Sequence, residues 1–215
     1  MIQFGSAHVI YIFEAARWTI VLSLIAFFGG AVLGLLLALA RVSRLLILRA
    51  LSAAYIQTIQ GTPLLILLFL SYFGLSLLGY RLAPIVAAGL SLTLYVGAFL
   101  GEIWRGCIQA VPRTQWEASD CIGLNRFQQY AYVILPQAVR IATPPTVGFM
   151  VQVVKNTSLA SVIGFVELTR AGQIVNNSTF QPLVVFLLVA AIYFAICYPL
   201  SVASRVLERK FNVAR

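Results

Sequence analysis

Long apolar runs dominate the chain and recur at the length needed to cross a bilayer. A membrane-spanning helix needs about 20 consecutive apolar residues. Stretches that reach or approach this length are Trp18 to Ala40, Ile56 to Leu78, Leu82 to Ile103, Ile141 to Val166 and Leu183 to Val202. The pattern predicts an all-α membrane protein with about five transmembrane helices, forming a single domain over residues 1–215.

The second run is interrupted near its start. Its polar and helix-loosening positions are Gln60, Gly61, Thr62 and Pro63, and we treat them as candidates for a structural or gating contact. Such interruptions are tolerated only where the backbone faces protein or a water-filled cavity. The preceding segment, Arg41 to Tyr55, has a basic amphipathic pattern that predicts a short helix lying at the membrane surface.

The third run carries small residues at near-helical spacing, among them Gly97, Gly101 and Gly106. Small side chains allow neighbouring membrane helices to approach closely. The same run holds Thr93 and Tyr95, which are candidates for lining a substrate path, although an aromatic residue at mid-membrane is more often a packing residue.

A polar break divides the fourth run. Its residues are Lys155, Asn156, Thr157 and Ser158. A helix that leaves the surface near Ile141 places Lys155 roughly 20 Å deep, at or past the middle of the bilayer. A lysine at that depth needs a polar cavity or a counter-charge. Two interpretations remain open, a substrate-facing site or interhelical hydrogen bonding with a lysine that snorkels outward.

Composition agrees with a membrane protein, since 61% of residues are hydrophobic and only 10% are charged. The net charge of +9 is spread between the apolar runs and does not form the single basic stripe of a nucleic-acid-binding protein. With the N-terminus outside, the inner segments hold eleven of the 15 basic residues: Arg41, Arg44, Arg49, Arg105, Arg113, Arg126, Arg140, Arg205, Arg209, Lys210 and Arg215. The charge bias therefore predicts an external N-terminus and a cytoplasmic C-terminus.

Residues 107–137 form the one long stretch of mixed polarity, and the charge bias places it inside. We expect a first short helix from Gln115 to Ile122, capped by Thr114 or a neighbour and ended by Gly123. Asn125 is a good N-cap for a second helix from Arg126 to Leu135, which Pro136 should stop. Two short helices at an angle are a shape suited to docking a partner.

Charged residues outside that loop have simpler interpretations. Glu102 and Arg105 are three residues apart near the inner end of the third run, which favours a structural ion pair. Glu167 and Arg170 should lie near the outer surface, either solvated or in contact with a partner, and we favour solvation.

Several chemistries are excluded by what the sequence lacks. Its one histidine is His8, before the first run, so neither a Ser-His pair nor a His-based metal site can form within the membrane. The three cysteines have no ligand spacing, and we predict no metal site. A phosphate-binding Gly-Lys-Ser/Thr loop is missing as well, so the chain cannot hydrolyse ATP itself. A membrane enzyme is disfavoured, whereas an ion-gradient-driven transporter or channel without an ATPase stays open as an alternative.

The loop around Glu117 resembles the EAA loop of ABC importer permeases. That pattern is Glu-Ala-Ala, three residues, Gly, nine residues, then Ile-x-Leu-Pro, and here the matching positions are Glu117, Ala118, Ser119, Gly123, Val133, Leu135 and Pro136. Segments TPLLILLFLSYFG, EIWRG and KNTSLASVIGFVELTRAGQ are similar to the polar amino acid branch, the histidine, glutamine and arginine type. Departures are Gln60, where that branch often has Arg, and Thr114, where it often has Gly.

The resemblance implies the permease fold of a type I importer that moves a polar or charged amino acid across the bacterial cytoplasmic membrane. It implies a second permease subunit, identical or related, an ATPase dimer that binds ATP and magnesium, and an external substrate-binding protein. It also implies that the loop docks into the ATPase, through Glu117, Ala118, Ser119, Asp120, Gly123 and Leu124. The particular amino acid and the choice between homodimer and heterodimer are left open.

Overall fold

The structure is a computed structural model that describes residues 4–212, and every regular element in that range is a helix. Arg215 of the basic tail and both ends of the predicted domain lie outside this range. The α-helices are α1 (Ser6–Val42), α2 (Leu46–Gln60), α3 (Leu64–Phe69), α4 (Leu75–Leu77), α5 (Pro84–Gln109), α6 (Arg113–Cys121), α7 (Arg126–Gln128), α8 (Leu135–Asn156), α9 (Leu168–Thr179) and α10 (Pro182–Asn212). Two π-helical segments, Leu70–Gly74 and Gln129–Ile134, and a 3₁₀ segment, Thr157–Ile163, continue neighbouring α-helices.

Three helices are long and apolar enough to cross a membrane alone, namely α1, α5 and α10. Two bent pairs bring the number of candidate spans to five. Leu46–Gln60 meets Leu64–Leu77 at 99°, and Arg126–Ile163 meets Leu168–Thr179 at 49°. The predicted class, an all-α protein with about five spans, is confirmed.

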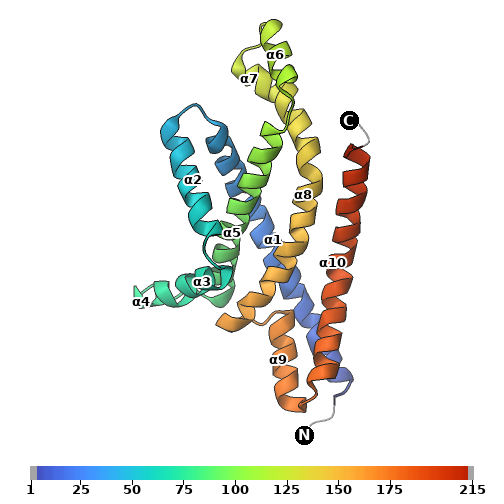
Figure 1. The fold of residues 1–215 in the computed structure, drawn as a ribbon. Coiled ribbons are helices and arrows are strands. Elements are labelled where there is room, and N and C mark those ends of the chain that lie inside the picture. Colours follow the sequence, from blue (N-terminus) through green and yellow to red (C-terminus); the bar gives the residue numbers. More distant parts are fainter. Residues whose placement is uncertain (1–3, 213–215) are drawn as a thin grey trace.

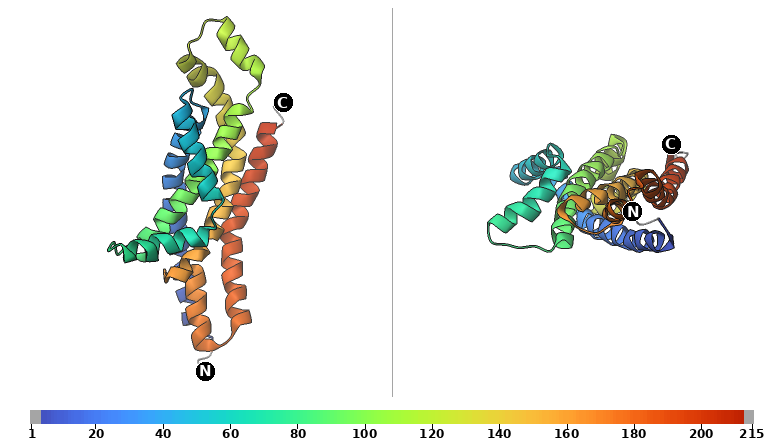
Figure 2. Two further views of the ribbon diagram at one scale, coloured as in Figure 1. Left: turned by 60° about the vertical axis from the view of Figure 1, so that its left-hand side comes forward. Right: turned by 90° about the horizontal axis from the view of Figure 1, so that it is seen from below.

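The long helices form an elongated bundle (Figures 1 and 2). The connection between α1 and α2, the α6 and α7 helices and the C-terminus lie at one end. The N-terminus and the connection between α9 and α10 lie at the opposite end, while α3 and α4 project sideways (Figure 1). The chain thus carries its polar loop and the basic C-terminal part of α10 at the same end.

Glycines at the interface between α1 and α5 allow these two helices to pack closely. A Cβ atom at Gly97 would lie 2.7 Å from Leu33 Cδ2, and one at Gly101 would lie 3.0 Å from Leu37 Cβ. The predicted close approach is therefore confirmed at these two glycines. It does not hold for Gly106, where nothing lies within 4 Å of the same position.

The second span differs from its prediction. We expected a surface helix over Arg41 to Tyr55 and a span over Ile56 to Leu78, but α2 runs unbroken from Leu46 to Gln60 with Ser52, Ile56 and Ile59 buried. The Tyr55 hydroxyl donates to the Leu94 carbonyl of α5 at 3.0 Å, so α2 packs on the bundle. Hydropathy alone cannot separate a straight helix from one that turns sharply at Gly61 and Pro63.

The helix after Asn125 also differs from its prediction. Pro136 does not stop it, because the chain passes through the π-helical turn Gln129–Ile134 directly into α8. Pro136 occupies the first turn of that α-helical run, where a missing N–H costs little. The first short helix begins at Arg113, with Pro112 in the capping position instead of Thr114.

Candidate functional site

The α6–α7 hairpin, residues 113–128, is held in one shape by its own turns. Gly123 has a φ of +75°, a left-handed conformation that glycine adopts without strain. Asn125 accepts a hydrogen bond from the Gln128 N–H through its side chain, and Gln128 accepts one from the Asn125 N–H, both at 3.0 Å. The predicted N-cap at Asn125 is confirmed as a reciprocal capping box.

Buried polar side chains fasten the inside of the hairpin. Gln129 is only 1% exposed and donates to the Asp120 carboxylate and to the Leu124 carbonyl. The buried Ser119 hydroxyl donates to the Trp116 carbonyl at 2.7 Å, and the Trp116 ring meets Tyr130 edge-on. These contacts join α6, the turn after it and the π-helical segment Gln129–Ile134.

The same hairpin is also tied to the start of the fourth span. Gln137 of α8 donates to the Gln115 side chain of α6 at 3.2 Å. Ile108, Val111, Ile134 and Ala138 form a small apolar core beneath it. The hairpin is therefore packed against the adjoining ends of α5 and α8.

The predicted docking residues divide into two groups. Glu117 and Ala118 are exposed, whereas Ser119 is buried, Leu124 is half-buried and the Asp120 carboxylate accepts a hydrogen bond from Gln129. The sequence interpretation missed two exposed apolar side chains at the tip, Ile122 at 73% and Phe127 at 78%. The available signal was their position on either side of Gly123 in an otherwise polar stretch.

Polar side chains also gather where the fourth span changes from α8 to the 3₁₀ segment. Lys155 is exposed in the last turn of α8, and within residues 4–212 both ion pairs belong to Glu102, so none reaches this lysine. Exposed Gln152, which we had counted within an apolar run, donates to the Asn156 side chain at 3.0 Å. Gln152, Lys155 and Asn156 form the polar face of α8.

The other predicted path residues point elsewhere. Thr157 is fully buried and its hydroxyl donates to the Val154 carbonyl, while the Ser158 hydroxyl donates to the Lys155 carbonyl. Thr93 lies against α1, since a Cβ at Gly29 would be 2.9 Å from its hydroxyl oxygen. Tyr95 packs on Phe99 of its own helix, and Phe99 stacks on Phe149 of α8.

Glu167 is a correction, because it is fully buried and not solvated. Its carboxylate caps α9 by accepting from the backbone N–H groups of Thr169 and Arg170 at 3.0 and 2.9 Å. The Tyr193 hydroxyl of α10 donates to it at 2.8 Å. The side chain therefore caps α9 and ties its start to α10.

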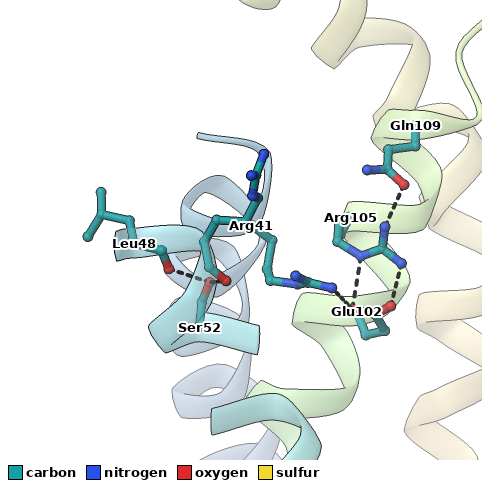
Figure 3. Close-up of polar contacts among 7 residues, drawn as sticks. Arg41, Leu48, Ser52, Glu102, Arg105 and Gln109 are labelled. Carbon is teal, nitrogen blue, oxygen red and sulfur yellow. Dashed lines mark hydrogen bonds and ion pairs between the residues drawn. The ribbon is translucent and has the colours of Figure 1, made fainter. Parts of the chain in front are cut away.

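The predicted pair of Glu102 and Arg105 is present within α5 and extends to a second helix, α1 (Figure 3). Arg105 Nε donates to Glu102 Oε2 at 2.9 Å, and Arg41 Nη2 at the end of α1 lies 3.9 Å from the same oxygen. Arg105 also donates to Gln109. One carboxylate thus serves two guanidinium groups on two helices.

Gln60 to Pro63 form the corner of the second span. Gln60 and Pro63 are exposed, and the Thr62 hydroxyl donates to the Thr58 carbonyl at 2.8 Å. Pro63 is the N-cap residue of α3, where its fixed φ and missing N–H are both tolerated. The corner is held by backbone geometry.

Comparison with known proteins identifies the family. Residues 30–213 match the binding-protein-dependent transport system inner membrane component, and the chain belongs to that family. It is 35% identical over 201 residues to the probable amino-acid ABC transporter permease protein YckA of Bacillus subtilis, covering 94% of this chain and 89% of that protein. It is also 35% identical to the glutamine transport system permease protein GlnP of Escherichia coli, covering 93% and 92%.

Solved structures agree. An amino acid ABC transporter crystallised with histidines superposes with a TM-score of 0.89 at 32% identity, covering 93% of this chain and 94% of that one. A chain of the MetNI methionine ABC transporter matches with a TM-score of 0.80 at 18% identity, which shows the shared fold. The resemblance to importer permeases is thereby confirmed.

Proposed function

We propose that residues 1–215 form one permease domain that moves a polar or charged amino acid through a bacterial cytoplasmic (inner) membrane, driven by a separate ATPase. The amino-acid permeases among its relatives support the cargo class. The end that holds the hairpin also holds the basic ends of α1, α5 and α10, so the positive-inside rule favours a cytoplasmic hairpin and an external N-terminus.

The hairpin is the observation that supports coupling to an ATPase. It projects beyond the bundle (Figure 2). Its tip combines exposed Ile122 and Phe127 with the acidic Glu117. Apolar anchors with a polar rim are the composition of a protein interface, and a stiff helix in a groove transmits displacement to α5 and α8.

The polar face of α8 is the proposed substrate contact. An amino acid carries a carboxylate and an ammonium group, and Lys155 with the amides of Gln152 and Asn156 offers partners for both. An exposed lysine within a span needs a polar neighbour. A second permease subunit that faces α8 would close a path around it, and an external binding protein would deliver the substrate.

The test of coupling to the ATPase replaces the two exposed apolar residues of the hairpin. Ile122→Asp together with Phe127→Asp should abolish co-purification of the ATPase subunit and ATP-dependent uptake in vesicles, because two charges would enter an apolar contact. Phe180→Asp is the matched control, since Phe180 is exposed at the opposite end of the bundle. Its φ of +54° suits aspartate, and this variant should behave as the wild type.

The alternative is a transporter or channel driven by an ion gradient. It predicts that uptake persists in vesicles without ATP and that the Ile122 and Phe127 substitutions leave uptake unchanged. Retained uptake in the double variant would overturn the ATPase-coupled function.

A further inference from the structure

Basic residues are concentrated where α1 ends and α2 begins. Arg41, Arg44 and Arg49 belong to this part of the chain, and together with Arg105 of α5 we call them the arginine corner. Arg41 and Arg105 both reach the carboxylate of Glu102 (Figure 3). Four positive groups against one negative group leave a net charge of +3 at this place.

The carboxylate of Glu102 already has two of these arginines as partners. Arg105 holds both oxygens of Glu102, and Arg41 approaches one of them at 3.9 Å. Arg44 and Arg49 are exposed, and within residues 4–212 neither forms an ion pair. The corner therefore has more positive charge than the chain itself neutralises.

Exposed apolar residues flank Arg44 and Arg49 in the sequence. Leu45, Leu46, Ile47 and Leu51 are 63%, 67%, 72% and 65% exposed. They belong to the start of α2, whose other face is buried through Ser52 and Ile56. Exposed leucines next to arginines, at the ends of spanning helices, match the boundary between acyl chains and headgroups.

We infer that the arginine corner binds the headgroup phosphate of an anionic phospholipid, with the acyl chains lying along the exposed apolar side chains of α2. Guanidinium groups pair well with phosphate oxygens. A free phosphate ion would leave the apolar side chains uncovered. A second copy of the chain placed there by two-fold symmetry would bring the same net charge of +3 and be repelled. The site goes beyond the transport function, and neither its charge nor its apolar face depends on which way the chain is inserted.

The experiment measures lipid binding to the purified permease–ATPase complex in detergent by native mass spectrometry. Phosphatidylglycerol and phosphatidylcholine are the two probes, and inorganic phosphate is the competitor. The variant is Arg44→Gln with Arg49→Gln. The control, Arg17→Gln with Arg81→Gln, removes the same charge from exposed arginines near the other end.

We expect wild type and control to bind phosphatidylglycerol well above phosphatidylcholine. The variant should bind it about thirtyfold more weakly, since each basic side chain near an anionic headgroup contributes about fivefold. Arg44→Lys with Arg49→Lys should retain most of the binding, which separates charge from folding.

Three results would overturn the inference. They are equal binding of the two lipids by the wild type, full displacement of phosphatidylglycerol by inorganic phosphate, and a change in permease stoichiometry in the glutamine variant, which would indicate a protein contact. Selective lipid binding in a complex that fails to transport amino acids would refute the proposed function and leave the lipid site standing.

Discussion

The α6–α7 hairpin and the break in the fourth span, residues 152–167, both interrupt an apolar chain with polar residues, yet their polar groups are satisfied differently. In and next to the hairpin, Asp120, Asn125 and Gln129 are all bonded to residues at most nine positions away in the sequence. In the break, Lys155 has no carboxylate partner within residues 4–212.

Glu167, only twelve positions further on, is fully bonded. The contrast separates a segment whose polar groups are bonded internally from one whose lysine has no charged partner in the part of the chain that the structure describes. A lysine on the surface of a span must reach a polar group, water or the headgroup region.

The sharpest test of this contrast is Lys155→Ala. If Lys155 contacts the substrate, uptake efficiency should fall by between about tenfold and a hundredfold, because a hydrogen bond to a charged group contributes about 1.5–3 kcal/mol. The thermal unfolding midpoint should not change, since no ion pair is lost. Initial rates of ATP-dependent uptake across substrate concentrations measure the effect.

Two variants control this measurement. Val162→Ala alters an exposed apolar side chain in the same break and should leave uptake unchanged. Lys155→Arg keeps the charge and should retain more uptake than alanine. Equal uptake by Lys155→Ala and Val162→Ala would show that the lysine only snorkels to the membrane surface.

The next largest effect is expected at the bonded end of the break. Glu167→Gln should lower the free energy of unfolding by about 2 kcal/mol, because three donors converge on the carboxylate and one would face the amide NH₂ group. The shift in thermal unfolding midpoint in detergent measures it.

Glu14 supplies the matched control, since it is exposed on α1 and Glu14→Gln should have no effect on the midpoint. Tyr193→Phe removes a single donor and should cost about 1 kcal/mol. Equal midpoints for Glu167→Gln and Glu14→Gln would mean that the buried carboxylate does not hold α9 to α10.

The sequence predicts elements well where one local rule governs them. The apolar runs Leu82 to Ile103 and Leu183 to Val202 correspond to α5 and α10, and the N-cap at Asn125 follows from its side chain. The bend at Gly61 and Pro63 was placed correctly, but its angle of 99° depends on packing of α2 against α5, which no local pattern encodes.

The residues of the candidate site were harder to predict, because their surroundings also depend on packing between distant segments. The sequence around Glu167 is typical of a surface residue. Its burial depends on contact with Tyr193, which lies 26 positions later. Gln152 was not singled out because the mean hydropathy of its apolar neighbours stays high despite one amide side chain. Ile122 and Phe127 become meaningful only when the hairpin is seen to project from the bundle.

The smallest effect tests whether the hairpin is rigid before it meets a partner. Gly123→Val should reduce ATP-dependent uptake about tenfold, because a residue with a Cβ in the left-handed conformation costs roughly 1–2 kcal/mol and a branched one is the least tolerated. Gly123→Asn should stay near wild type, since asparagine accepts that conformation. Uptake and ATPase co-purification are measured together, with Gly106→Ala as a control at an uncrowded glycine.

If the hairpin instead folded only on docking, the free chain would avoid this strain and the shape would be set by the partner. Valine and asparagine would then give the same uptake, and the hairpin would resemble the break in needing another component to complete it.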